Sequence, residues 1–167
     1  MSAMREGPGG TDRAVSVTVG YVMTLAVSTL LLSGLFVAGG SFVETERERA
    51  AQGELTVVGE RIAADLGTVD RVASTASPPR ENLTVDRPLT LPDRVSGTGY
   101  RIRIEATGSA GTIALESEQA DATVEVPFRT SEGITVRNAT VRGGDLRIYW
   151  DAPSGVDDEG EVVVRER

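Results

Sequence analysis

The chain has 167 residues, a formal net charge of −8, and no cysteine or histidine. This length is enough for one domain of ordinary size and a membrane helix. The composition excludes disulfides, thiolate metal sites and histidine-based acid–base catalysis. The negative charge argues against nucleic acid as a partner, because like charges repel the phosphate backbone.

The most informative stretch is residues 14–43, which contain no charged side chain and directly follow Asp12 and Arg13. The stretch is about thirty residues long, and about twenty apolar residues cross a bilayer as a helix. We expect a leader at residues 1–14 and a transmembrane helix at residues 15–43. A secretory signal cut after Gly39 or Gly40 is the alternative, but its apolar region would be only about 7–15 residues long.

Small side chains recur every four residues in this segment, at Ser16, Gly20, Thr24 and Ser28. Residues four apart lie on one face of a helix. Small side chains on one face allow two helices to approach closely in lipid, so we expect this face to pack against another helix. The alternative is that glycine, serine and threonine are simply common in membrane helices.

Arginines lie on both sides of the apolar segment, so the positive-inside rule does not decide its orientation. Two sequons, at Asn82 and Asn138, are candidate N-glycosylation sites. With the short leader, they favour a cytoplasmic N-terminus and an extracellular C-terminal domain. The bilayer is then a partner of the chain, and the localisation is the cell membrane, crossed once.

The helical pattern continues past the apolar segment through residues 44–76. Apolar residues recur there every three or four positions, which is the helical period. They are Leu55, Val58, Ile62, Leu66, Val69 and Val72. Pro78 and Pro79 end the pattern. The sequence predicts one near-continuous helix from Val15 to Ala73, whose second half has an apolar stripe that needs cover.

The pattern changes to a period of two in residues 77–167. In residues 100–106, apolar side chains alternate with Arg101, Arg103 and Glu105, as in a half-buried strand. Further strands are expected at residues 83–91, 112–117, 123–128, 134–141, 146–150 and 161–165, separated by glycine-containing turns. Tyr149 and Trp150 are expected to anchor the core or its rim.

These elements predict an α+β fold, in which a long N-terminal transmembrane or pilin-type helix packs on a C-terminal antiparallel β-sheet or small β-sandwich. One face of the sheet would cover the helix stripe. The other face, rich in arginine and glutamate, would meet water.

All 17 basic residues are arginine, and acidic residues number 25. Such an acid-rich, lysine-free composition is similar to that of halophilic archaeal proteins, although a GC-rich genome also favours arginine codons. Residues 12–16, Asp-Arg-Ala-Val-Ser, are followed by Gly20 and the long apolar helix. This order resembles the N-terminus of haloarchaeal type IV pilins and pilin-like proteins.

The resemblance implies that a prepilin peptidase recognises Arg13 and cuts between Ala14 and Val15, as in a class III signal peptide. It also implies other pilin-like subunits as partners in a filament. Ser16-Val17-Thr18 stands where such pilins usually carry a proline, and Val19 stands where many bacterial pilins carry a glutamate. A minor or accessory subunit of a type IV pilus-like structure therefore fits better than a major pilin.

No combination of residues predicts catalysis, so we expect no enzyme activity, no cofactor and no metal site. The acidic run Asp157-Asp158-Glu159 matches no calcium loop and is interpreted as a solvated turn. Glu116, Glu118, Asp121 and Glu125 straddle an expected hairpin and are interpreted as an acidic surface. The main functional alternative is an unprocessed single-pass membrane anchor that presents an extracellular β binding domain. An exported enzyme is a third, weaker alternative.

Overall fold

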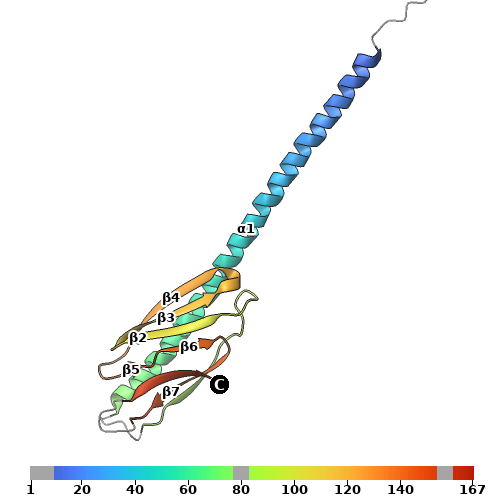
Figure 1. Cartoon of the computed structure of the whole chain (residues 1–167). Helices are drawn as coiled ribbons and strands as arrows, with labels where there is room; N and C mark the ends of the chain where they lie inside the picture. The colour runs from blue at the N-terminus through green and yellow to red at the C-terminus, as the bar shows by residue number, and fades with distance from the viewer. Residues whose placement is uncertain (1–9, 77–82, 154–159) are drawn as a thin grey trace, which may run out of the picture. The chain divides into compact units, whose positions relative to one another are not determined.

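The computed structural model describes residues 10–76, 83–153 and 160–167, with side chains from residue 17 onward. The described residues form one α-helix, α1 (Gly10–Thr75), and a 3-10 turn, η1 (Glu118–Ala120) (Figure 1). The strands are β1 (Asp86–Thr90), β2 (Arg101–Thr107), β3 (Ala110–Ser117), β4 (Ala122–Arg129), β5 (Thr135–Val136), β6 (Ala139–Arg142), β7 (Asp145–Asp151) and β8 (Glu161–Glu166).

The chain divides into two compact units, Met1–Thr45 and Glu46–Arg167, and α1 contributes residues to both. We call the second unit the head. The predicted α+β fold is confirmed, and α1 extends slightly beyond the expected bounds at both ends.

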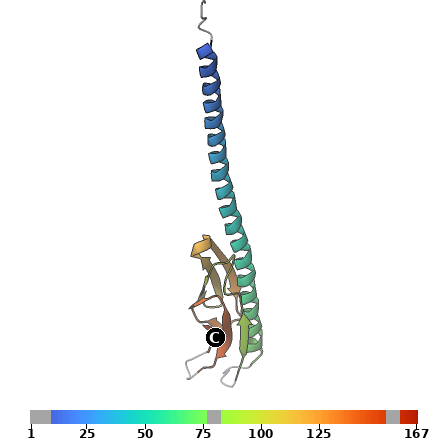
Figure 2. The ribbon, with the colours of Figure 1, turned by 90° about the vertical axis from the view of Figure 1, so that its right-hand side faces the viewer.

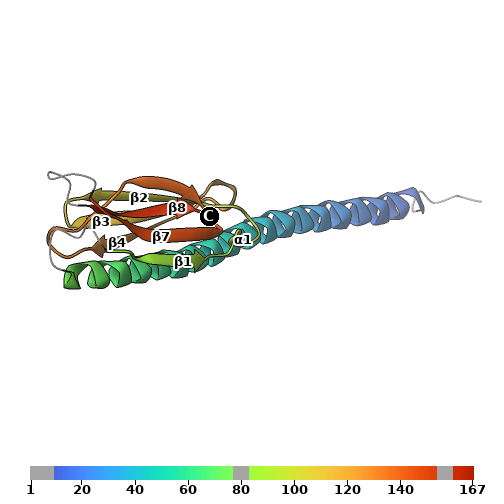
Figure 3. The ribbon, with the colours of Figure 1, turned by 90° about the horizontal axis from the view of Figure 1, so that it is seen from below.

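The strands of the head form two sheets, with the orders β1-β7-β8-β5 and β4-β3-β2-β6. The part of α1 that belongs to the head runs along one side of both sheets (Figures 2 and 3). Alternating burial along β2 and β7 places their apolar side chains in the core and their charged side chains in water. The head is therefore a helix covered by sheets, with charged side chains of β2 and β7 on the exposed side. β8 differs, because the consecutive residues Val162, Val163 and Val164 are all buried.

The apolar stripe of α1 provides one side of the core of the head, and the strands and loops provide the larger part. Leu55, Ile62 and Leu66 are at most 1% exposed. The predicted Val72 is an exception, because it is 43% exposed while Ala73 is fully buried. Position 73 lies four residues after the buried Val69, which keeps it on the stripe, whereas position 72 is rotated toward solvent.

At Gly59, α1 lies close to the sheet that contains β3 and β4. A Cβ atom at this position would lie 2.7 Å from a Val126 methyl group and 2.8 Å from a Leu115 methyl group. Real Cβ atoms essentially never come so near to another heavy atom. The missing side chain therefore allows the helix and sheet to pack against each other here.

Three acidic side chains of α1 attach the helix to segments of the β region. Glu54 accepts the Ser96 backbone N–H at 2.6 Å, and Asp65 pairs with Arg87. Asp70 accepts both the backbone N–H of Ser131, at 2.8 Å, and its hydroxyl, at 3.0 Å. Hydrogen bonds to a carboxylate are among the stronger ones in proteins, so these contacts fix the position of the helix along the sheets.

The strand expected at residues 134–141 is in fact two strands. β5 pairs with β8, and β6 pairs with β2 in the other sheet. The pairing of β5 with β8 is parallel, whereas the other strand pairs of both sheets are antiparallel. The chain thus passes from one sheet to the other between Val136 and Ala139.

Trp150 is a core residue, as expected, and is 5% exposed. Its ring packs closely on Gly160, where a Cβ atom would come within 2.6 Å. The φ angle of Gly160 is +72°, which also favours glycine. Tyr149 points to the opposite face by the strand alternation, and the Arg147 guanidinium lies 5.1 Å from the centre of its ring.

Tyr100 is a second buried aromatic residue with a polar end. Its hydroxyl donates to the Pro92 carbonyl oxygen at 2.8 Å. Burial and, to a smaller degree, the charge of Asp93 raise the pKa of Tyr100 to about 12. Both effects disfavour the phenolate anion.

We expect Gly59→Leu to destabilise the head by about 1–3 kcal/mol, because the new side chain overlaps Val126 and Leu115. Gly53→Leu is the matched control, since nothing lies within 4 Å of a Cβ atom there and leucine is a better helix former than glycine. Thermal unfolding of the two variants in detergent, followed by circular dichroism, checks this. Equal unfolding midpoints would contradict the close packing at Gly59.

We also expect the head to lose stability as the pH rises from about 10, the ordinary tyrosine value, toward the raised pKa of Tyr100 at about 12. Below this range Tyr100 is protonated in both the folded and the unfolded state, so its full contribution to the stability of the head is present. Tyr100→Phe should flatten the pH dependence of the unfolding midpoint in this range. Tyr149→Phe is the control and should leave the dependence unchanged; a wild-type slope in Tyr100→Phe would refute the assignment.

Candidate functional site

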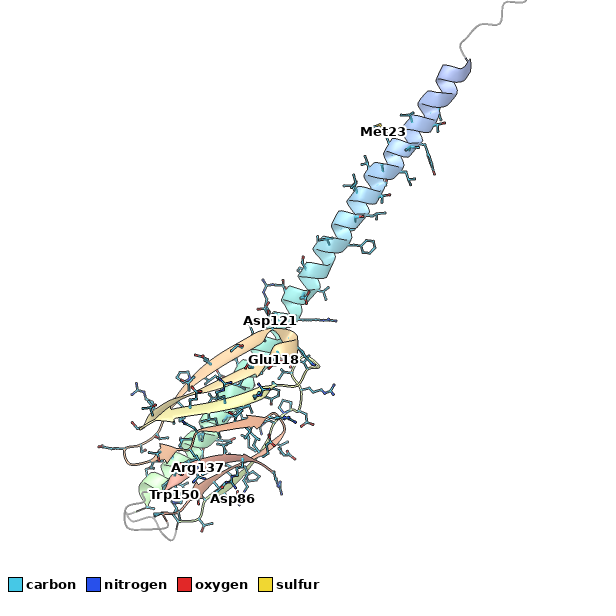
Figure 4. All side chains as sticks on the ribbon, viewed as in Figure 1. Met23, Asp86, Glu118, Asp121, Arg137 and Trp150 are labelled. Atoms are coloured by element: carbon cyan, nitrogen blue, oxygen red, sulfur yellow. The ribbon has the colours of Figure 1, made fainter. Side chains whose placement is uncertain are left out.

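The apolar half of α1 is the most unusual surface of the chain. Its large apolar side chains between Val17 and Val43 are 50–79% exposed. These side chains project from the helix on all sides (Figure 4, where Met23 is labelled). By length and composition α1 is able to cross a membrane, and none of its most apolar stretch is buried. Exposed apolar surface of this extent marks a membrane or protein interaction site.

The predicted small-residue face lies within this segment. Gly20, Thr24 and Ser28 are exposed. The Thr24 hydroxyl donates to the Gly20 carbonyl oxygen at 2.9 Å, and the Thr29 hydroxyl donates to that of Leu25 at the same distance. These hydroxyl groups are satisfied within their own helix, which removes the cost of placing them in lipid. Nothing lies within 4 Å of a Cβ atom built at Gly20, so the space beside it is open.

The residues expected to be recognised and cut by a peptidase are Arg13, Ala14 and Val15. Their backbone belongs to α1, which begins at Gly10 rather than at the expected Val15. Their side chains, and that of Ser16 in the small-residue face, lie outside the described part of the structure.

Of the two sequon asparagines, the structure describes Asn138 and not Asn82. Asn82 lies outside the described residues, as does the acidic run 157–159. Asn138 is exposed, directly before β6, and its amide oxygen accepts the Ala106 backbone N–H at 2.7 Å. This hydrogen bond across to β2 had no signal in the sequence, because it depends on a pairing between distant strands.

Surface grooves of about 320, 550 and 460 Å³ lie among the described residues of the head. The first combines the carboxylates of Asp93, Glu116 and Glu118 with the guanidinium groups of Arg101 and Arg142. The described residues contain no group of three or more acidic side chains placed to hold a metal ion. The absence of catalysis stays a prediction.

The acidic residues singled out in the sequence lie around one turn. η1 connects β3 to β4, and Glu118 and Asp121 lie at this end of the head (Figure 4). Glu118 is 3.5 Å from Arg101. Asp121 has a positive φ of 47°, which closes the turn. Glu116 lies in β3 and Glu125 in β4, so the interpretation of these four residues as an acidic surface places it on the turn and the two strands beside it.

Comparison with curated proteins and with solved structures finds no match. Comparison with protein families finds one whose description is "Family of unknown function (DUF7266)", and the match covers residues 10–164. The matched region includes α1 from its first described residue and all eight described strands except the end of β8. The chain therefore belongs to the DUF7266 family.

Proposed function

We propose that this chain is a pilin-like surface subunit, minor or accessory, that is rooted in the cell membrane through the apolar half of α1. Its head lies outside the cell. The subunit joins other pilin-like subunits through the same apolar helix, in a type IV pilus-like structure. A prepilin peptidase prepares it for assembly by removing the leader.

The observation that carries this proposal is the contrast between the two halves of one helix. In the head, the apolar stripe of α1 is covered by two sheets, and Leu55 and Ile62 are fully buried. Between residues 17 and 43 the apolar side chains surround the helix and are exposed. A helix that is apolar on all sides belongs in a membrane or among other apolar helices.

The small-residue face supports assembly in addition to anchoring. Lipid is as apolar as the helix, so close packing rather than the hydrophobic effect drives helices together in a bilayer. Gly20 has no side chain and lies on the same face as Thr24 and Ser28, so a neighbouring helix backbone is able to come close to this face.

The first experiment is mass spectrometry of the N-terminus of the protein purified from membranes. We expect the mature chain to begin at Val15, because the junction at Arg13 and Ala14 resembles a prepilin processing site. Replacing Arg13 with glutamine should leave the leader attached. An intact leader on the wild-type protein would favour the alternative of a fixed single-pass anchor for a binding domain.

Assembly through the helix makes a second prediction. Gly20→Leu should reduce the recovery of the subunit in sheared surface filaments at least severalfold, because leucine fills the space that a neighbouring helix needs. Gly40→Leu is the control, since by the 3.6-residue helical period it lies on nearly the opposite side of α1. No atom lies within 4 Å of a Cβ atom placed on either glycine, so both variants should fold. Equal recovery of Gly20→Leu and wild type would exclude this face from assembly.

A further inference from the structure

Asn138 and Thr140 lie together on the outer face of the sheet formed by β4, β3, β2 and β6. Both side chains are exposed, whereas Val141 in the same strand is buried. Side chains two residues apart along an extended chain point to the same face. The two residues that define the sequon are therefore displayed side by side toward solvent.

The hydrogen bond of Asn138 explains part of its role. β6 pairs with β2 only along Arg101–Ile104, so Ala106 in the continuing β2 has no backbone partner in β6. The amide oxygen of Asn138 accepts the Ala106 N–H instead, and thus extends the ladder by a side-chain contact. This contact uses the amide oxygen of Asn138, so the amide nitrogen is left to react. The contact does not involve Thr140, so it does not explain the threonine at that position.

Two grooves adjoin the sequon on this outer face. One, of about 550 Å³, is lined by Arg103, Glu105 and Thr107 as well as by Asn138 and Thr140. The other, of about 460 Å³, runs between β6 and β8 and is lined by Arg137 and Arg165 on its polar side. Guanidinium, carboxylate and hydroxyl groups are suitable hydrogen-bond partners for sugar hydroxyls. A glycan on Asn138 would thus have open space and polar contacts on both sides.

We propose that Asn138 carries an N-linked glycan whose first sugars lie along these grooves. The transfer forms a bond between the Asn138 Nδ2 and the anomeric carbon of a glycan donated from a lipid phosphate. The bond from that carbon to the phosphate oxygen breaks, the phosphate leaves as an anion, and the amide nitrogen gives up one proton. The amide oxygen is not consumed, so its hydrogen bond to Ala106 persists in the glycosylated protein. The proposal rests on the extracellular position of the head in the proposed function.

The test is peptide mapping of the full-length protein purified from the membranes of its own organism. Cleavage after arginine isolates Asn138 in the peptide 138–142, which is separate from the peptide that contains Asn82. We expect the peptide 138–142 to carry a sugar mass. Thr140→Ala should abolish this mass, and the matched variant Thr140→Ser should retain it, because serine also completes a sequon. Both variants keep Asn138 and its hydrogen bond.

A peptide 138–142 without sugar in the wild-type protein would overturn the proposal, as would a sugar mass that survives Thr140→Ala. Trypsin added to intact cells separates this failure from a failure of the proposed function. If external trypsin degrades the head while the peptide is unmodified, the glycan proposal alone fails. If the head is protected and unmodified, its extracellular position is also refuted.

Discussion

The fold depends on the burial of one apolar stripe, on the part of α1 that belongs to the head. A single helix with Leu55, Ile62 and Leu66 on one side is not stable in water without cover. Each sheet also has an apolar face that cannot meet water alone. Gly59 allows these surfaces to come close, and the carboxylates of Glu54, Asp65 and Asp70 fix their register. Without the sheets the helix stripe would be exposed to water, and without the helix the apolar faces of the sheets would be exposed.

The same helix carries a second apolar surface, and this one is exposed. Its side chains between residues 17 and 43 surround the helix, so one sheet, which covers one side, would not bury them. Burial on all sides requires lipid or several neighbouring helices. The proposed membrane anchoring and assembly rest on this requirement.

Periodicity in the sequence predicted the long helix, most of its buried stripe and the position of nearly every strand, because these features depend on local patterns. It failed where the outcome depends on distant partners. In residues 134–141 two polar residues, Arg137 and Asn138, interrupt the alternation, and the segment divides between β8 and β2 at this point. The close packing of Gly59 on Val126 and Leu115 likewise depends on residues distant in the sequence, as does the hydrogen bond between Asn138 and Ala106. The small-residue face could be found from sequence, because it depends only on the helical period.

The hydroxyl groups of the apolar segment bear on the choice between an anchor and an assembling subunit. Thr24 and Thr29 donate to carbonyl groups of the preceding turn, so neither needs a partner helix to avoid an unsatisfied group in lipid. The segment is therefore able to remain alone in a bilayer after insertion. Contact with another helix would then depend on close packing, which exposed glycines such as Gly20 and Gly34 allow. The satisfied hydroxyl groups are thus compatible with both proposed roles, and the choice between them rests on the processing and assembly of the subunit.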